Sequence, residues 1–179
     1  MPSLQNKHKE VAILSNSKTV SELFEYAIAL EKAAEALYLE LEKMFSHYVE
    51  VASFWHSYAN EENGHASYLE SIKTNVAKNR LSSPSDEAML KKVLYCLEQA
   101  SPARLVNIKT LDDAYKLAVE LENSETNAIF EFMIVNFSTD ELAKSHTFLR
   151  TQLSTHIARL ENDFPYKGRI ARQGILALK

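Results

Sequence analysis

Two side chains with metal-binding chemistry, Glu62 and His65, are separated by one helical turn in the segment "EENGHASYLE" at 61–70. At this spacing both side chains lie on the same face of a helix. That face is otherwise apolar or aromatic, with Val51, Phe54, Trp55, Tyr58, Leu69 and Ile72. A charged group in such a position needs a partner, because removing an ion from water costs several kcal/mol. Glu62 therefore requires a hydrogen-bonding group, a basic side chain or a metal ion.

Three further glutamates interrupt apolar helical faces elsewhere in the chain. Glu31 breaks the apolar face of residues 20–45, and Glu122 and Glu125 break that of residues 111–135. No Lys or Arg occupies the inward positions of the predicted long helices, so acids would face acids. A cation is the natural partner, and the structural alternative is a buried hydrogen bond or a helix face assigned with the wrong rotation. Carboxylate and imidazole together favour iron or manganese over magnesium or calcium.

An internal repeat relates the two halves of the chain. His65 follows Glu31 by the same number of residues as His156 follows Glu122, since 65 − 31 and 156 − 122 are both 34. Two helix pairs related in this way would direct Glu31, His65, Glu122 and His156 inward. The repeat therefore predicts a two-metal centre inside a helical bundle.

Capping signals predict where the first helices lie. Thr19 and Glu22 form a capping box at the start of a helix that continues through Phe45, and a second helix is expected over about 49–77. Ser83 is the predicted N-cap of a middle helix from Pro84 to Gln99, which would carry the chain between the two halves.

The second half contains two more predicted long helices. Thr110 is the expected cap of a helix from Leu111 to about Val135. Ser138 opens a fourth helix that Pro165 closes, and a short basic helix is expected after it. The predicted organisation is an N-terminal extension at 1–18, a bundle at 19–163 and a tail at 164–179.

Composition supports an all-α domain and excludes several functions. The 179 residues include only three Gly and four Pro, too few for the turns of most β-rich folds. The net charge of −4 disfavours nucleic-acid binding, and one cysteine cannot form a Cys-rich metal site. The apolar run at 11–14 is too short for a signal sequence or a membrane span, so we expect a cytoplasmic protein that does not bind membranes.

The segments "ALEKAAEALY" at 29–38, "EENGHASYLE" at 61–70 and "VELENSETNAIF" at 119–130 resemble the ferritin-like superfamily, and within it the rubrerythrin-like group. The resemblance covers about residues 20–163 and implies a four-helix bundle with a crossover helix between its second and third long helices. It also implies a di-iron carboxylate centre, with manganese as an alternative metal. The ligands that it implies are Glu31, Glu62, His65, Glu122, Glu125 and His156.

The resemblance also implies a function and its partners. Rubrerythrin-like proteins carry out peroxidase or oxidase chemistry on peroxide or dioxygen, and without a rubredoxin module this chain would need a separate electron donor. Tyr38 and Tyr58 are candidates for hydrogen bonds that orient the carboxylates, although core tyrosines are common. A homodimer is the expected assembly.

One position departs from the family pattern. The fourth helix should carry a second E-x-x-H, but the residue three before His156 is Leu153. Either Glu125 replaces the missing carboxylate, or one metal site is weak, or the centre is degenerate. Enzymatic activity is therefore left open. The alternative is a non-enzymatic bundle with a single-metal or degenerate site that acts in iron handling or protein interaction, and a helical interaction module without metal is a third class.

Overall fold

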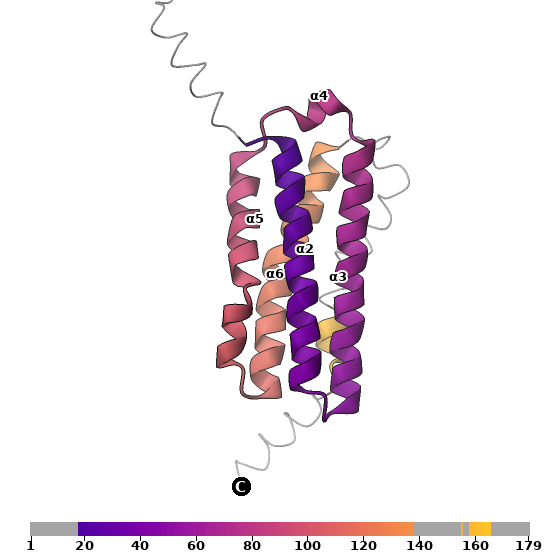
Figure 1. Ribbon diagram of the computed structural model, residues 1–179, viewed down its shortest axis with the longest axis vertical. Helices are drawn as coiled ribbons and strands as arrows, with labels where there is room; N and C mark the ends of the chain where they lie inside the picture. The colour runs from indigo at the N-terminus through magenta and orange to yellow at the C-terminus, as the bar shows by residue number, and fades with distance from the viewer. Residues whose placement is uncertain (1–17, 138–154, 156–157, 166–179) are drawn as a thin grey trace, which may run out of the picture.

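The described part of the chain is helical and contains no β-strand. A computed structural model describes residues 18–137, 155 and 158–165 (Figure 1). Its elements are, in order, α2 (Val20–Met44), α3 (Val49–Asn75), α4 (Lys78–Leu81), α5 (Glu87–Gln99), the 3-10 helix η1 (Pro102–Asn107) and α6 (Leu111–Asn136). The all-α class expected from the low Gly and Pro content is confirmed for these residues. None of these helices is long and apolar enough to cross a membrane.

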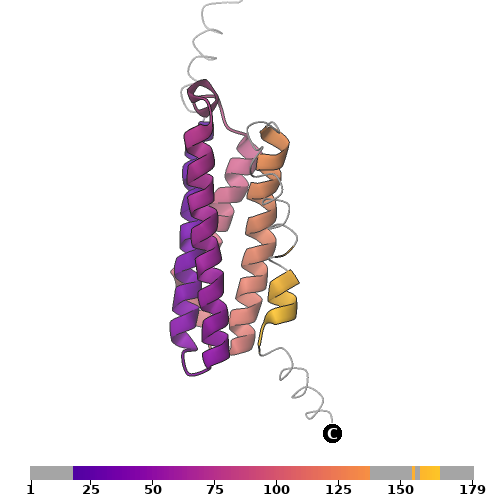
Figure 2. The same ribbon diagram turned by 90° about the vertical axis from the view of Figure 1, so that its right-hand side faces the viewer.

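The long helices lie side by side with their axes nearly parallel or antiparallel. α2 and α3 form an antiparallel pair, and α5 packs against both α2 and α6 (Figures 1 and 2). α4 lies at one end of the molecule, in the connection from α3 to α5, and η1 leads into α6 at the other end (Figure 1). Glu31 on α2, Glu62 and His65 on α3, and Glu122 on α6 are buried in the interior between these helices.

The first two predicted helices agree with α2 and α3 to within about two residues. α2 begins after Thr19, where the Glu22 backbone N–H donates to the Thr19 hydroxyl at 3.2 Å. The Thr19 backbone N–H donates in turn to the Glu22 carboxylate at 2.8 Å. This reciprocal pair is the predicted capping box, and it satisfies two backbone donors that helix geometry leaves without partners.

The start of the middle helix was predicted wrongly. α5 begins at Glu87 rather than Pro84, and its N-cap is Asp86, whose carboxylate accepts the Met89 N–H at 2.7 Å. The segment containing Ser83 instead pairs with the start of α2. Val20 N–H donates to the Ser83 carbonyl at 3.0 Å, and Ser85 N–H donates to the Lys18 carbonyl at 2.8 Å. This long-range backbone pairing competes with helix initiation at Pro84, and local sequence carries no signal for it.

The third predicted long helix agrees with α6. Its first turn is capped by Thr110, whose hydroxyl accepts the Asp113 N–H at 3.1 Å. The fourth predicted helix lies mostly outside the described residues, as do the 1–17 segment, the tail after Pro165 and the proposed cap at Ser138. Of that helix, residues 158–163 are helical and lie beside the lower part of α6 (Figure 2).

Gly64 lies inside α3, where a glycine often marks the close approach of another backbone. No such approach is present among the described residues: a Cβ atom added at Gly64 would meet none of their atoms within 4 Å, and the residue is exposed on α3. We therefore expect Gly64→Ala to raise the free energy of unfolding by about 1 kcal/mol, since Ala loses less backbone entropy in a helix. Urea denaturation of both proteins measures this difference, and an unchanged or lower stability would contradict it.

Candidate metal site

Four of the five polar residues that interrupt the helical faces are buried in the interior, and the side chain of the fifth, Glu125, lies outside what the structure describes. Relative exposures are 1% for Glu31 on α2, 3% for Glu62 and 2% for His65 on α3, and 2% for Glu122 on α6. The apolar periodicity of each helix directs these positions inward together with their neighbours. The inward orientation predicted for these four residues is therefore confirmed.

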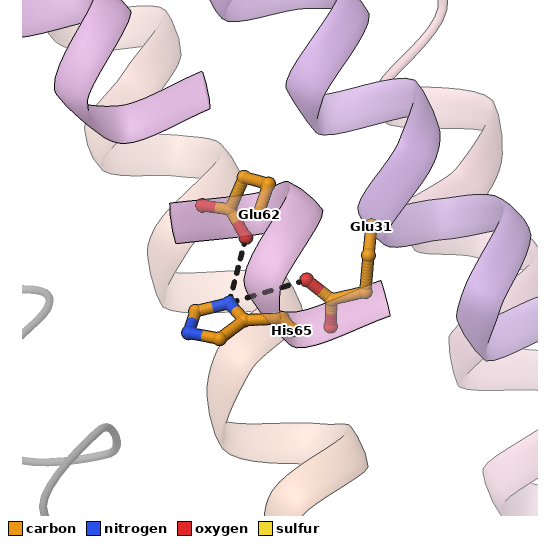
Figure 3. Close-up of side chains that lie close together, drawn as sticks. All are labelled: Glu31, Glu62 and His65. Carbon is orange, nitrogen blue, oxygen red and sulfur yellow. Dashed lines mark hydrogen bonds and ion pairs between the residues drawn. The ribbon is translucent and has the colours of Figure 1, made fainter. Parts of the chain in front are cut away.

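Glu31, Glu62 and His65 converge on one point between α2 and α3. His65 Nδ1 lies 2.9 Å from Glu62 Oε2 and 3.4 Å from Glu31 Oε2 (Figure 3). One ligand atom from each residue lies within 4.8 Å of the others. Glu62 and His65 meet because they are one turn apart on α3, whereas Glu31 reaches them from the facing helix. We refer to these three residues as the triad.

Within the described part of the chain, one carboxylate oxygen of the triad has no hydrogen-bond partner. Glu31 Oε1 is fully buried, and no donor lies within hydrogen-bonding distance among the described residues. An unsatisfied buried carboxylate oxygen is costly, since it loses its water without gaining a donor. A cation placed between the three side chains would satisfy it. This oxygen is the feature of the interior that distinguishes a ligand site from a completed network of buried hydrogen bonds.

A proton on His65 offsets part of the negative charge when metal is absent. Burial alone would lower the pKa of His65, but hydrogen bonds with Glu31 and Glu62 and the charges of those carboxylates raise it to about 10. The metal-free triad then consists of an imidazolium between two carboxylates. Because a metal binds only neutral imidazole through this nitrogen, metal ion and proton compete for His65.

This raised pKa predicts a pH dependence for the metal-free protein. The folded-state pKa of about 10 lies above the ordinary value of 6.5, so the native state holds a proton that the unfolded chain releases. The stabilisation of the folded state by this proton on His65 is complete below about pH 6.5. It falls by about 1.4 kcal/mol per pH unit above that value, until it is lost near the folded pKa. Urea unfolding of metal-free wild type and His65→Gln across this range measures the difference, and parallel pH profiles would contradict the prediction.

Glu122 is buried in the same interior but lies outside the triad. The Tyr38 hydroxyl donates a hydrogen bond of 2.5 Å to Glu122 Oε1. Tyr58, another candidate for orienting the carboxylates, has its pKa raised by burial and by the charges of Glu122 and Glu62. Both tyrosines therefore lie among the acids, and the structure shows a direct contact from Tyr38 to one of them.

Two predicted ligands lie outside what the structure describes. They are Glu125, whose side chain is not described, and His156; the position of Leu153 also lies outside the described residues. Whether the second half of the repeat completes a two-metal centre remains a prediction from sequence.

An ionic contact that the sequence did not predict lies next to Glu62 on α3. Arg159, in helical residues 158–163, pairs with Glu61 and donates to the Ser57 hydroxyl at 3.0 Å. Its guanidinium also lies 5.1 Å from the ring centroid of Tyr58. Glu61 and Ser57 are one turn apart on α3, but this spacing is too common on exposed helix faces to predict an Arg partner.

The fold and site define a class: a helical protein with a buried group of two carboxylates and one imidazole. Comparison with known proteins extends this description no further. No protein-family model matches the chain, and neither a curated protein nor a solved structure shows significant similarity to it.

Proposed function

We propose that this protein binds a divalent transition-metal ion between α2 and α3, with Glu31, Glu62 and His65 as ligands. The observation that carries the proposal is the Glu31 carboxylate, whose Oε2 lies 3.4 Å from His65 Nδ1 and whose Oε1 is buried without a hydrogen-bond donor in the described chain. Two carboxylates and one imidazole suit iron or manganese better than magnesium or calcium, which prefer sites made only of oxygen.

The burial of the triad favours a metal site over a helical interaction module. An interaction module would leave Glu31, Glu62 and Glu122 solvated or paired with basic side chains. All three are at most 3% exposed, and the contacts of Glu31 are with His65. The cost of burying these acids therefore calls for a compensating cation.

The resemblance to rubrerythrin-like proteins supports a more specific proposal. Under this proposal, residues 19–163 form a ferritin-like four-helix bundle, and α5 belongs to the crossover connection. Glu122, Glu125 and His156 help to hold a second ion. A pair of ferrous ions supplies, when bound, the two electrons that reduce peroxide or dioxygen, and a separate donor restores them. The protein residues hold the ions and keep water away from them.

One observation favours a non-enzymatic, single-metal form as the second candidate. The three ligand atoms of the triad converge on one point, whereas Glu122 is engaged by Tyr38 and lies outside the group. Together with Leu153 in place of a second bridging carboxylate, this arrangement favours one strong site. Such a protein would act in iron handling or in protein contacts.

Metal titration tests both candidates. Trp55, the one tryptophan of the chain, is fully buried in the core on α3, the helix that carries Glu62 and His65, so its fluorescence should report binding of Fe²⁺ or Mn²⁺. Elemental analysis after removal of free metal gives the stoichiometry. Two ions per chain support the dimetal centre, and one supports the single-metal form. No bound metal after anaerobic reconstitution would reject both.

Leu153→Glu provides a separate test of the dimetal proposal. If residue 153 stands where the family carries its second bridging carboxylate, the added glutamate should strengthen the weaker site and raise binding towards two ions per chain. Calorimetric titration with Mn²⁺ compares the variant with wild type, and Leu153→Gln controls for polarity without charge. Equal binding by all three proteins would show that the fourth helix was aligned wrongly with the family pattern.

A further inference from the structure

A compact group of aromatic side chains lies in the core among the buried acids. Tyr38 stacks on Trp55 with ring centroids 5.7 Å apart and planes inclined by 8°. Tyr58 contacts both, with centroids 5.4 Å from Tyr38 and 6.3 Å from Trp55. All three residues have relative exposures of 0%. Tyrosine and tryptophan are the side chains that lose a single electron most readily after cysteine, and stacked rings allow rapid electron transfer.

The two stacked residues, Trp55 and Tyr38, differ in their hydrogen bonds. The indole Nε1–H of Trp55 is buried and has no acceptor among the described residues. An oxidised Trp55 would therefore keep its proton and remain a radical cation, which is a stronger oxidant than the neutral radical. The Tyr38 hydroxyl, in contrast, donates to the Glu122 carboxylate at 2.5 Å. Oxidised phenols release their proton, and Glu122 is in position to accept it.

We propose that Trp55 and Tyr38 form a one-electron relay in which an oxidising equivalent arriving at Trp55 is transferred to Tyr38. In this step one electron passes from the Tyr38 phenol to the Trp55 radical cation. The phenolic O–H bond breaks, and the proton forms a new O–H bond on Glu122. The products are neutral Trp55, a neutral Tyr38 radical and a protonated Glu122. Charge is conserved, because a cation and a carboxylate are both neutralised.

This transfer suits a buried site because it creates no new charge in a medium of low dielectric constant. The positive charge of the Trp55 radical cation and the negative charge of the Glu122 carboxylate are both neutralised. The step therefore removes two buried charges instead of moving one. Its role rests on the proposed function, since peroxide reacting at the metal site would be the source of strong oxidants. The relay would direct such oxidants onto Tyr38, from which an external donor could restore the phenol.

The chemistry of the pair can be tested in the full-length metal-free protein, independently of metal binding. A laser flash ionises Trp55, and hexaamminecobalt(III) takes up the ejected electron and is reduced to cobalt(II). Transient absorption then follows the tryptophan radical, and electron paramagnetic resonance after freezing identifies the product. In wild type we expect a tyrosyl radical to replace the tryptophan radical, more slowly in D₂O because an O–H bond breaks.

Variants assign the two partners. Tyr38→Phe should abolish the tyrosyl signal and leave a long-lived tryptophan radical, and Glu122→Gln should slow the transfer because the amide is a poorer proton acceptor. Tyr95→Phe, at an exposed tyrosine on α5, should leave the kinetics unchanged. The proposal is overturned if the tryptophan radical decays equally fast in wild type and Tyr38→Phe, or if Tyr58→Phe alone removes the tyrosyl signal.

A second measurement separates the relay from the metal site. Protein reconstituted with Fe²⁺ is mixed with hydrogen peroxide and frozen, and its tyrosyl signal is compared with that of Tyr38→Phe. A tyrosyl radical after the flash but none after peroxide would retain the relay and reject peroxide as its source. Absence of metal binding with an intact flash reaction would reject the proposed function alone.

Discussion

Glu62→Ala is expected to abolish binding of iron or manganese. Glu62 supplies a carboxylate to the triad and lies 2.9 Å from His65 Nδ1, so its loss removes a ligand and leaves only two. Groups that merely orient a ligand contribute about 10- to 100-fold to metal affinity, and loss of the ligand itself should exceed about 100-fold. Titration of the metal-free protein with Mn²⁺ or, anaerobically, with Fe²⁺ measures the change.

Glu70→Ala is the matched control for this experiment. Glu70 is also a glutamate on α3, two turns beyond Glu62, but it is exposed and pairs with Lys32 at the surface. Its removal should leave metal affinity unchanged. If Glu62→Ala and Glu70→Ala bind metal as wild type does, the triad is a buried ion pair with a structural role, and the metal proposal is rejected.

Metal loading is expected to stabilise the fold by a large amount. An ion that binds only the native state adds about 2.7 kcal/mol when its free concentration is about 100 times the Kd. For a chain of this length, that corresponds to a rise of about 5–10 °C in the midpoint of thermal unfolding. The physical reason is that an ion bound at the proposed site would contact Glu31 on α2 and His65 on α3, and these ligands lie close together only when the chain is folded. Differential scanning calorimetry with and without chelator measures the shift.

The control for metal loading is the variant without the site. In Glu62→Ala the chelator should have no effect on the thermal midpoint, because there is no bound ion to remove. Calcium at the same concentration should stabilise wild type much less than manganese, since imidazole is a poor ligand for it. A shift of the same size in wild type and Glu62→Ala would indicate non-specific binding at the acidic surface.

Helix positions were predictable because their determinants are local. The capping box of Thr19 and Glu22 and the cap at Thr110 depend on residues within one turn, and the structure contains both. The middle helix shows the limit of this reasoning. Its start depends on the backbone pairing of residues 83–85 with residues 18–20, which are close only in the folded chain.

The candidate site was predictable in its composition but not in its arrangement. Apolar periodicity determines that Glu31, Glu62, His65 and Glu122 point inward, because a helix of known period has only one face that it can bury. Periodicity within one helix carries no information on the axial register between two helices. Thus the sequence did not distinguish Glu31, which meets His65, from Glu122, which lies beside Tyr38.

The sequence by itself determined that this protein is helical and that acids and an imidazole lie in its interior, because hydrogen bonding and burial within a helix follow from residues a few positions apart. Only the tertiary structure decided which of these side chains meet. The packing of α2 on α3 brings one ligand atom each of Glu31, Glu62 and His65 within 4.8 Å of one another. It also leaves one oxygen of Glu31 without a hydrogen-bond donor in the described chain. The position of α6 relative to α2 allows the hydroxyl of Tyr38 to donate to Glu122. The physical reason is that helix register and rotation result from the fit of many side chains at once, which no single motif encodes.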